Sequence, residues 1–199
     1  MEDKNLAKVV RESLEDQHEQ AEGSAGKEFF SWILIIAVAI GAALLLNRFI
    51  IVNAQVTRGS MSNTNHTGDR VLGLRVDYWF HGPVRGDVIF FNNPDREEEI
   101  YVKRVIGLPG DTVEIKAGVT YVNGTALEEP YLAETPWEMD FGPYEVPEGY
   151  YFFLGDNRNN SQDSRYLNHT YVAREKILGK AYLIYYPEVR RIDYSDQTE

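Results

Sequence analysis

Residues 101–111, with the sequence YVKRVIGLPGD, decide the fold of this chain. The first six are mostly β-branched or aromatic and a Pro-Gly-Asp turn follows them, so the pattern predicts a strand that ends just before the turn. Lys103 interrupts the apolar run. If its side chain points into the protein, desolvation lowers its pKa, because burial disfavours the charged form. The stretch therefore indicates a β-rich fold with one ionisable group near its interior.

Short runs of the same kind recur along the chain after residue 55, separated by Gly, Asn, Asp and Pro. No long stretch there has helical periodicity, which favours a mostly β domain of antiparallel sheets, partly barrel-like. The acidic triplet Glu97–Glu99 is expected at a solvated hairpin tip, and no site is assigned to it. The predicted strands are Arg70–Val76, Asp87–Phe91, Ile100–Ile106, Thr112–Ile115, Thr120–Val122, Tyr150–Leu154 and Ala181–Tyr186.

A long apolar run lies near the N-terminus. Phe29–Leu46 carries no charge over 18 residues. At about 1.5 Å per residue it makes a helix of roughly 27 Å, close to the thickness of a hydrocarbon core. Lys27 and Arg48 flank it as charges able to reach lipid headgroups. We therefore expect one transmembrane helix, with the lipid bilayer as a partner. The expected divisions are an acidic cytoplasmic tail over 1–27, the anchor over 28–52 and an extracytoplasmic β-rich domain over 53–199.

A cleaved signal peptide is the alternative interpretation of this run, with Val52–Ala54 as its cleavage site. The preceding tail is long and acidic, however, and the apolar run exceeds the usual length of about 7–15 residues. An uncleaved signal-anchor fits better. The positive charges on the two sides barely favour a cytoplasmic N-terminus.

The composition excludes several classes of site. The chain has no cysteine, so disulfides, zinc-thiolate sites and thiol nucleophiles are excluded. A formal net charge of −11 argues against a nucleic-acid partner, because phosphate binding needs clustered Lys and Arg. The four histidines lack the spacing of metal ligands, and we expect no metal or organic cofactor.

Besides the strand lysine, two short blocks hold residues that can carry chemistry. Gly59–Thr64 places Ser60 in a segment without strand or helix periodicity, a short distance past the apolar run. Gly155–Arg165 is an unusually polar loop that follows an apolar strand. In this loop Asp156 and Asp163 each lie two residues before an arginine, which indicates an ordered, hydrogen-bonded structure.

Taken in order, these blocks resemble the motifs of the type I signal peptidase family of Ser-Lys proteases. The resemblance extends along nearly the whole domain after the apolar run. Several ordered and spaced motifs are far more specific than any one alone. The matching segments are Ser60–Thr64 for S-M-x-P-T, Gly68–Val71 for G-D, Arg85–Ile89 for R-G-D-V-[IV], Lys103–Asp111 for the lysine box, Gly155–Arg165 for G-D-N-R-x-N-S-x-D-S-R, and Gly179–Ala181 for G-K-A.

The resemblance implies a role for five residues. Ser60 would be the nucleophile and Lys103 the general base. Ser161 matches the family serine that hydrogen-bonds the lysine and orients it. Asp163 and Arg165 match residues that hold the polar loop in place. The backbone N–H of Ser60 would be one donor of the oxyanion hole.

The implied activity is a membrane-bound serine endopeptidase that removes signal peptides from exported preproteins through an acyl-enzyme. Its base must be neutral, so the lysine pKa would have to fall from about 10.4 to roughly 7–8. Substrates would carry small residues at the first and third positions before the scissile bond. The resemblance places a single-pass protein in the plasma membrane, with its catalytic domain on the extracytoplasmic side. It leaves the oligomeric state open.

The serine block departs from the family pattern. Asn63 stands where the motif has proline, so a fixed φ is lost. Arg58 occupies the position two before the nucleophile, where some members carry a serine that completes the oxyanion hole. Ser62 raises a question of register, which Met61 answers because the family serine directly precedes Met.

The sequence is compatible with two alternative functions. A weakly active or inactive relative would act as a membrane-anchored assembly or binding partner, for example in surface-fibre assembly, and the altered serine block motivates it. A self-cleaving Ser-Lys protease of the repressor type is the other, but those proteins are soluble and the apolar run counts against it.

Overall fold

The computed structural model describes most of the chain after its N-terminal tail. The tail over 1–27 and the positions Arg58, Ser62 and Asn63, on which several sequence predictions rest, lie outside the described residues. The described residues are 28–56, 59–61, 64 and 66–192.

The chain divides after Leu46 into two compact units. The first contains most of a 22-residue apolar helix, Glu28–Phe49, no part of which is buried inside the protein. An apolar helix exposed on all sides has the length and composition to cross a bilayer, as predicted. It is shorter than the expected anchor over 28–52, because Ile51 and Val52 already belong to a strand.

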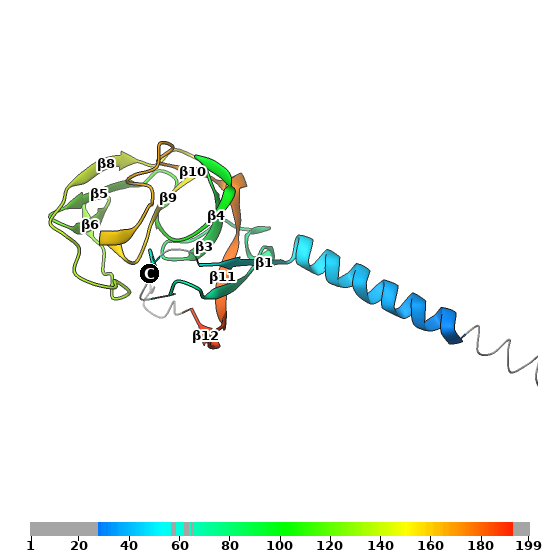
Figure 1. Ribbon diagram of the computed structural model, residues 1–199. Helices are drawn as coiled ribbons and strands as arrows, with labels where there is room; N and C mark the ends of the chain where they lie inside the picture. The colour runs from blue at the N-terminus through cyan, green and yellow to red at the C-terminus, as the bar shows by residue number, and fades with distance from the viewer. Residues whose placement is uncertain (1–27, 57–58, 62–63, 65, 193–199) are drawn as a thin grey trace, which may run out of the picture. The chain divides into compact units, whose positions relative to one another are not determined.

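The second unit is a β domain (Figure 1). Three 3-10 turns lie between its strands: η1 (Val76–Tyr78), η2 (Arg158–Asn160) and η3 (Arg174–Lys176). The strands are β1 (Ile51–Gln55), β2 (Arg70–Leu74), β3 (Val88–Asn93), β4 (Arg96–Gly107), β5 (Thr112–Lys116), β6 (Val119–Val122), β7 (Thr125–Ala126), β8 (Phe141–Glu145), β9 (Tyr150–Leu154), β10 (Val172–Ala173), β11 (Ile177–Tyr186) and β12 (Arg190–Arg191).

These strands form two sheets in which every pairing is antiparallel. The larger sheet has the order β1-β2-β11-β3-β4-β9-β10, with β12 paired to β11. The smaller has the order β7-β6-β5-β8 and lies at the opposite end of the domain from β1 in Figure 1. The prediction of a mostly antiparallel β domain is confirmed. β4 joins the sheets, because it lies inside the larger one and the turn after it leads into β5.

The seven predicted strands all correspond to observed ones, but the sequence missed others. The predicted anchor over 28–52 includes the first two residues of β1, and β8 follows an irregular segment without a clear period. The acidic triplet Glu97–Glu99 lies within β4 rather than at the hairpin tip. The tip is the Pro94-Asp95 turn, since Asn93 pairs with Arg96.

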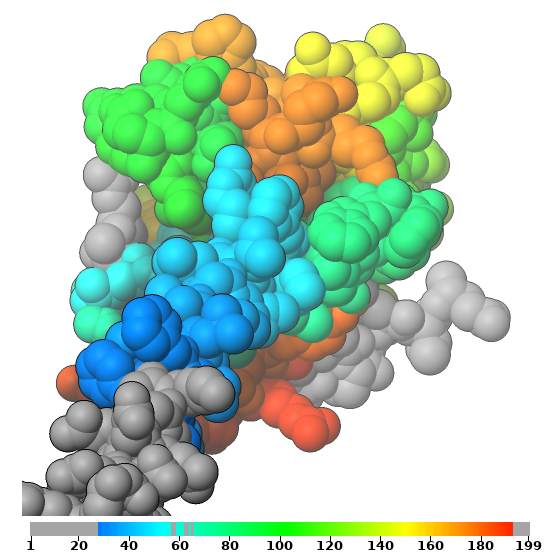
Figure 2. All heavy atoms as spheres, turned by 90° about the vertical axis from the view of Figure 1, so that its right-hand side faces the viewer, coloured from blue at the N-terminus to red at the C-terminus, as the bar shows by residue number. Residues whose placement is uncertain are grey.

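Figure 2 shows this hairpin in green beside the orange segment that includes η3. Lys176 forms an ion pair with Glu97, and the backbone N–H groups of Asn168 and His169 donate to the Asp95 carboxylate. These contacts hold the hairpin against residues 168–176, the segment that leads into β11.

The core lies between strands that are covered on both faces. All four residues of Val88–Phe91 in β3 are fully buried, as are Phe152–Leu154 in β9. Such continuous apolar runs are typical of strands packed on both sides. Phe91 stacks on Phe153 with ring centroids 4.6 Å apart, so the central strands are joined by side chains as well as by hydrogen bonds.

A substitution at Gly73 in β2 tests the packing of β2 against β11 and Phe90. A Cβ at this position would overlap the carbonyl oxygen of Lys180 in β11 and the ring of Phe90. We expect Gly73→Ala to lower the free energy of unfolding by about 1–3 kcal/mol, because overpacking forces the neighbours to shift. Denaturant unfolding in detergent, followed by circular dichroism, measures it, and an unchanged midpoint would contradict the assigned β2–β11 contact.

Candidate active site

Ser60 and Lys103, the two residues predicted to be catalytic, are 43 positions apart in sequence and are in contact in the structure. Lys103 Nζ and Ser60 Oγ are hydrogen-bonded at 2.5 Å. Both side chains are buried, at 5% and 7% exposure. A nucleophile and a base within hydrogen-bonding distance are the geometric requirement for nucleophilic catalysis.

β4 presents the lysine. Successive side chains on a strand point to opposite faces, so Lys103 and Arg104 project to different sides of β4. The Lys103 amine lies 5.1 Å from the centroid of the Tyr101 ring and 3.3 Å from the Val102 carbonyl oxygen. Val105 behind it is fully buried. Burial of this kind disfavours an ammonium relative to a neutral amine.

The pair lies in a groove of about 1060 Å³. β1 forms one wall and Glu98–Lys103 of β4 another, with Asn159–Gln162 of the polar loop closing the end. β1 is an edge strand of the larger sheet, and β9 pairs with β4 only from Arg104 onward. Both walls therefore have an edge without a neighbouring strand, where backbone N–H and C=O groups can pair with an extended chain. The sequence had assigned no role to Glu98, which lines this groove.

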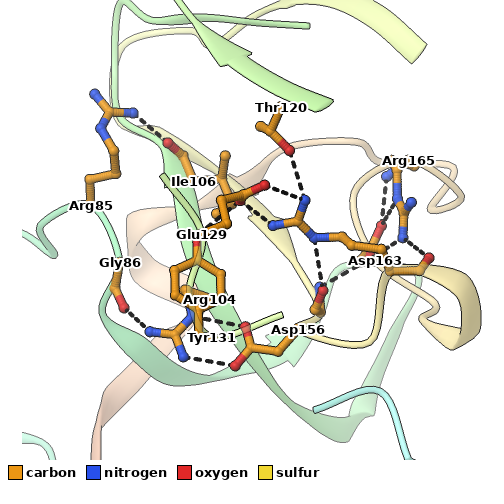
Figure 3. Close-up of polar contacts among 12 residues, drawn as sticks. Arg85, Gly86, Arg104, Ile106, Thr120, Glu129, Tyr131, Asp156, Asp163 and Arg165 are labelled. Atoms are coloured by element: carbon orange, nitrogen blue, oxygen red, sulfur yellow. Dashed lines mark hydrogen bonds and ion pairs between the residues drawn. The ribbon is translucent and has the colours of Figure 1, made fainter. Parts of the chain in front are cut away.

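The polar loop is ordered by its own side chains, as predicted. Asp163 accepts a hydrogen bond from the Gly155 N–H at 3.1 Å and binds Arg165 through both carboxylate oxygens, at 2.8 and 2.9 Å. Arg165 also donates to the carbonyl oxygen of Arg158 at 2.8 Å. Charge-assisted, bidentate contacts of this kind hold a loop in one conformation. Figure 3 shows them at its right side.

Asp156 does not pair with its sequence neighbour Arg158 but with an arginine that is distant in sequence. Arg104, on β4, donates to both oxygens of Asp156 at 2.8 and 2.7 Å and to the carbonyl oxygen of Gly86 at 2.9 Å (Figure 3). Both partners of this pair are almost completely buried. Arg158 pairs instead with Glu129. The sequence could not reveal these partners, because they come from other strands and loops.

The loop also contacts Ser60 and its neighbour Met61 directly. The Asn157 N–H donates to the Ser60 carbonyl oxygen at 3.0 Å, and the Asp156 N–H lies 3.2 Å from Met61 Sδ. Ser161 Oγ is buried next to Gly155 and, among the described residues, has no hydrogen-bond partner. Its expected bond to the lysine is therefore not made here, and its orienting role stays a prediction.

Among the residues that the structure describes, no three His, Asp or Glu side chains lie so that they could hold a metal ion together. His169 bonds to Asp95 and His66 lies 3.9 Å from Asp69, both at the surface. The chemistry that the site can carry is proton transfer between a hydroxyl and an amine.

The chain is similar to known proteins over most of its length. The family model described as signal peptidase, peptidase S26, matches residues 29–186. A probable signal peptidase I-2 of Synechocystis is 34% identical over 187 residues, covering 92% of this chain and 83% of the relative. Signal peptidase I of Bacillus licheniformis is 37% identical over 175 residues, covering 82% and 93%. A crystal structure of a signal peptidase I from Enterococcus faecalis is 38% identical and covers 49% of this chain and 95% of its own, with a TM-score of 0.44.

The chain therefore belongs to the signal peptidase family, peptidase S26. The resemblance inferred from the motifs is confirmed.

A substitution at Gly155 tests the contact between the loop and Ser60. A Cβ here would overlap both Ser161 Oγ and the Ser60 carbonyl oxygen. We expect Gly155→Ala to lower kcat by roughly 100-fold, because a displacement of about 1 Å in a catalytic group has that effect. The measurement is the cleavage rate of a precursor protein, with circular dichroism to verify folding. A folded variant of normal kcat would show that this close approach is unimportant.

Proposed function

We propose that this protein removes signal peptides from exported precursor proteins, with Ser60 as the nucleophile and Lys103 as the general base. The observation that carries the proposal is the buried 2.5 Å contact between Ser60 Oγ and Lys103 Nζ. The names of its relatives, signal peptidase I, supply the class of substrate.

The reaction follows from this contact. Neutral Lys103 takes the proton of the Ser60 hydroxyl as Oγ attacks the scissile carbonyl carbon. The tetrahedral intermediate collapses, and the Lys103 ammonium gives the proton to the departing amine of the mature protein. The Lys103 amine then takes a proton from water as the water oxygen attacks the acyl carbon, and the Lys103 ammonium returns the proton to Ser60 Oγ as the signal peptide leaves with a free carboxylate. Each half-reaction returns the lysine to its neutral form.

The surroundings of the pair support this assignment. The Ser60 backbone N–H is one donor for the oxyanion, because it moves with the attacking residue. Ser161 lines the groove together with the pair, and its buried Oγ has no hydrogen-bond partner among the described residues, so it is suited to accept a hydrogen bond from the Lys103 ammonium and to orient it. Asp163 and Arg165 act one step further away, by fixing the loop that carries Ser161.

The groove suits an extended peptide. A substrate lying between β1 and β4 would use their backbone groups as an added strand does. In an extended chain the first and third residues before the scissile bond face the same side. Ala54, Val56 and Val102 line the groove and offer apolar contacts there. Shallow apolar sites of this kind favour small residues at both positions.

The helix gives the reaction its location. Glu28–Phe49 is the one candidate span in the part of the chain that the structure describes, and it anchors the enzyme to the membrane. An anchored enzyme and an anchored substrate meet at a high effective concentration. We place the tail over 1–27 in the cytoplasm and the β domain outside it.

The dyad is tested with a precursor that carries an Ala-x-Ala site. We expect Ser60→Ala and Lys103→Met each to lower cleavage by at least about 100-fold, because one loses the nucleophile and the other the base. Lys176→Met is the matched control, since this lysine pairs with Glu97 at the surface. Ser62→Ala should cleave normally.

Mass spectrometry of the products measures the rate and the cleaved bond. Cleavage at the wild-type rate by either dyad variant would refute the assignment of roles. A folded wild-type protein that cleaves nothing would instead favour a binding partner over an enzyme.

The orientation is tested by cysteine labelling, because the chain has no cysteine of its own. Thr125 lies in the exposed strand β7. We expect Thr125→Cys to react with a membrane-impermeant maleimide on intact cells, and Ser13→Cys to react only after permeabilisation. The opposite pattern would reverse the proposed topology.

A further inference from the structure

We propose that Glu129 and Tyr131 are positioning residues for the Ser60–Lys103 pair, acting through two buried arginines. They lie in an irregular segment, residues 127–140, that connects β7 and β8 and belongs to none of the recognised motifs. The proposal rests on the proposed function, because it concerns the same dyad. Neither residue lines the groove, so neither touches the substrate.

The segment is attached along the outside of the polar loop. The Ala133 N–H donates to the Asp156 carbonyl oxygen at 3.1 Å, and the Trp137 N–H donates to Asn159 Oδ1 at 2.8 Å. Asn159 in turn donates to the Thr135 carbonyl oxygen at 3.1 Å. The loop that touches the nucleophile is therefore supported from behind by residues 127–140.

Tyr131 covers the arginine that adjoins the catalytic lysine in sequence. Its ring centroid lies 3.9 Å from Cζ of Arg104 (Figure 3). Burial raises the pKa of Tyr131, so the phenol stays neutral, and its hydroxyl donates to Glu129 at 2.9 Å. A neutral aromatic ring against a guanidinium is an attractive contact that also keeps water from one face of the cation.

Arg104 transmits this contact to the nucleophile. It holds the carboxylate of Asp156, which also accepts from the Thr64 hydroxyl. Arg104 itself lies 3.4 Å from Thr64 Oγ1. The backbone N–H of Asp156 contacts Met61, next to Ser60. Ser60 and Thr64 are thus each held to β4, Ser60 by Lys103 on one face and Thr64 by Arg104 on the other.

Glu129 acts through the second arginine. Its carboxylate pairs with Arg158, and both side chains are largely buried. Arg158 also donates to the Gly155 carbonyl oxygen at 3.0 Å and to Thr120 at 2.7 Å. Gly155 is the residue in close contact with the Ser60 carbonyl oxygen and Ser161. The two positioning residues therefore support the nucleophile from both sides of the loop.

The expected consequence is a loss of kcat without a change in KM. If the ring of Tyr131 is removed, water reaches Arg104 and the Arg104–Asp156 pair loosens, so the distance between Ser60 Oγ and Lys103 Nζ increases. The substrate groove keeps its lining. A residue that only stabilised the fold would instead lower the amount of active enzyme and the unfolding temperature.

The kinetic test uses the full-length protein in detergent micelles and the Ala-x-Ala precursor. We expect Tyr131→Leu and Glu129→Gln to lower kcat by roughly 10- to 100-fold with KM unchanged. Tyr131→Phe, which keeps the ring, should restore most of the lost activity. The matched control is Trp137→Leu, which alters an exposed side chain of the same segment, at 62% exposure, and should behave as wild type.

Hydrogen exchange gives a readout that does not need activity. We expect Tyr131→Leu and Glu129→Gln to increase deuterium uptake in the peptide that contains Ser60–Thr64, while Trp137→Leu leaves it unchanged. Wild-type kcat and unchanged uptake in both positioning variants would overturn the inference. A kcat loss in Tyr131→Phe equal to that in Tyr131→Leu would also overturn it, because the ring contact would then be irrelevant.

Failure of the proposed function has a different signature. If the wild-type protein cleaves no precursor, the exchange experiment alone decides whether Glu129 and Tyr131 hold the Ser60 segment. If either variant does not fold, the other carries the test, because the two act through different arginines.

Discussion

The catalytic end of this domain depends on the buried ion pair between Arg104 and Asp156. Two charges taken out of water cost several kcal/mol each unless their partners satisfy them, so the pair tolerates little displacement. Asp156 binds the guanidinium through both oxygens, and Gly86 accepts a further hydrogen bond from it. Strand β4, the polar loop and Thr64 therefore have to come together around this ion pair. Removal of either partner would leave an isolated charge in the interior.

This constraint explains how a serine and a lysine from distant segments come within hydrogen-bonding distance. β4 projects Lys103 into the groove from one face and Arg104 into the ion pair from the other. Because the two residues are adjacent, any structure that satisfies Arg104 also fixes the position of the lysine. The polar loop completes the arrangement, since Asp156 and Asn157 both contact the residues around Ser60. The geometry of the Ser60–Lys103 pair and the stability of the domain thus depend on the same strand.

The membrane helix and the groove have separate physical origins. An exposed apolar helix is stable only in an apolar solvent, which is the reason the anchor could be recognised from composition alone. The groove exists because β1 is the edge strand of the larger sheet and because β9 does not pair with the part of β4 that precedes Arg104. Two strand edges therefore stay unpaired. Edges of this kind normally invite aggregation, but here residues of both strands line one cleft.

The sequence by itself determined the helix, the seven predicted strands and the family, and it named Ser60 and Lys103, because periodicity and motif spacing are local properties. It missed β1, whose apolar residues merge with the helix before it, and it placed Glu97–Glu99 at a tip instead of in β4. Only the tertiary structure decided that Asp156 pairs with Arg104, 52 residues away, rather than with its neighbour Arg158. The same holds for Glu129 and Tyr131. Such partners depend on strand register and loop packing, which the order of residues along the chain does not display.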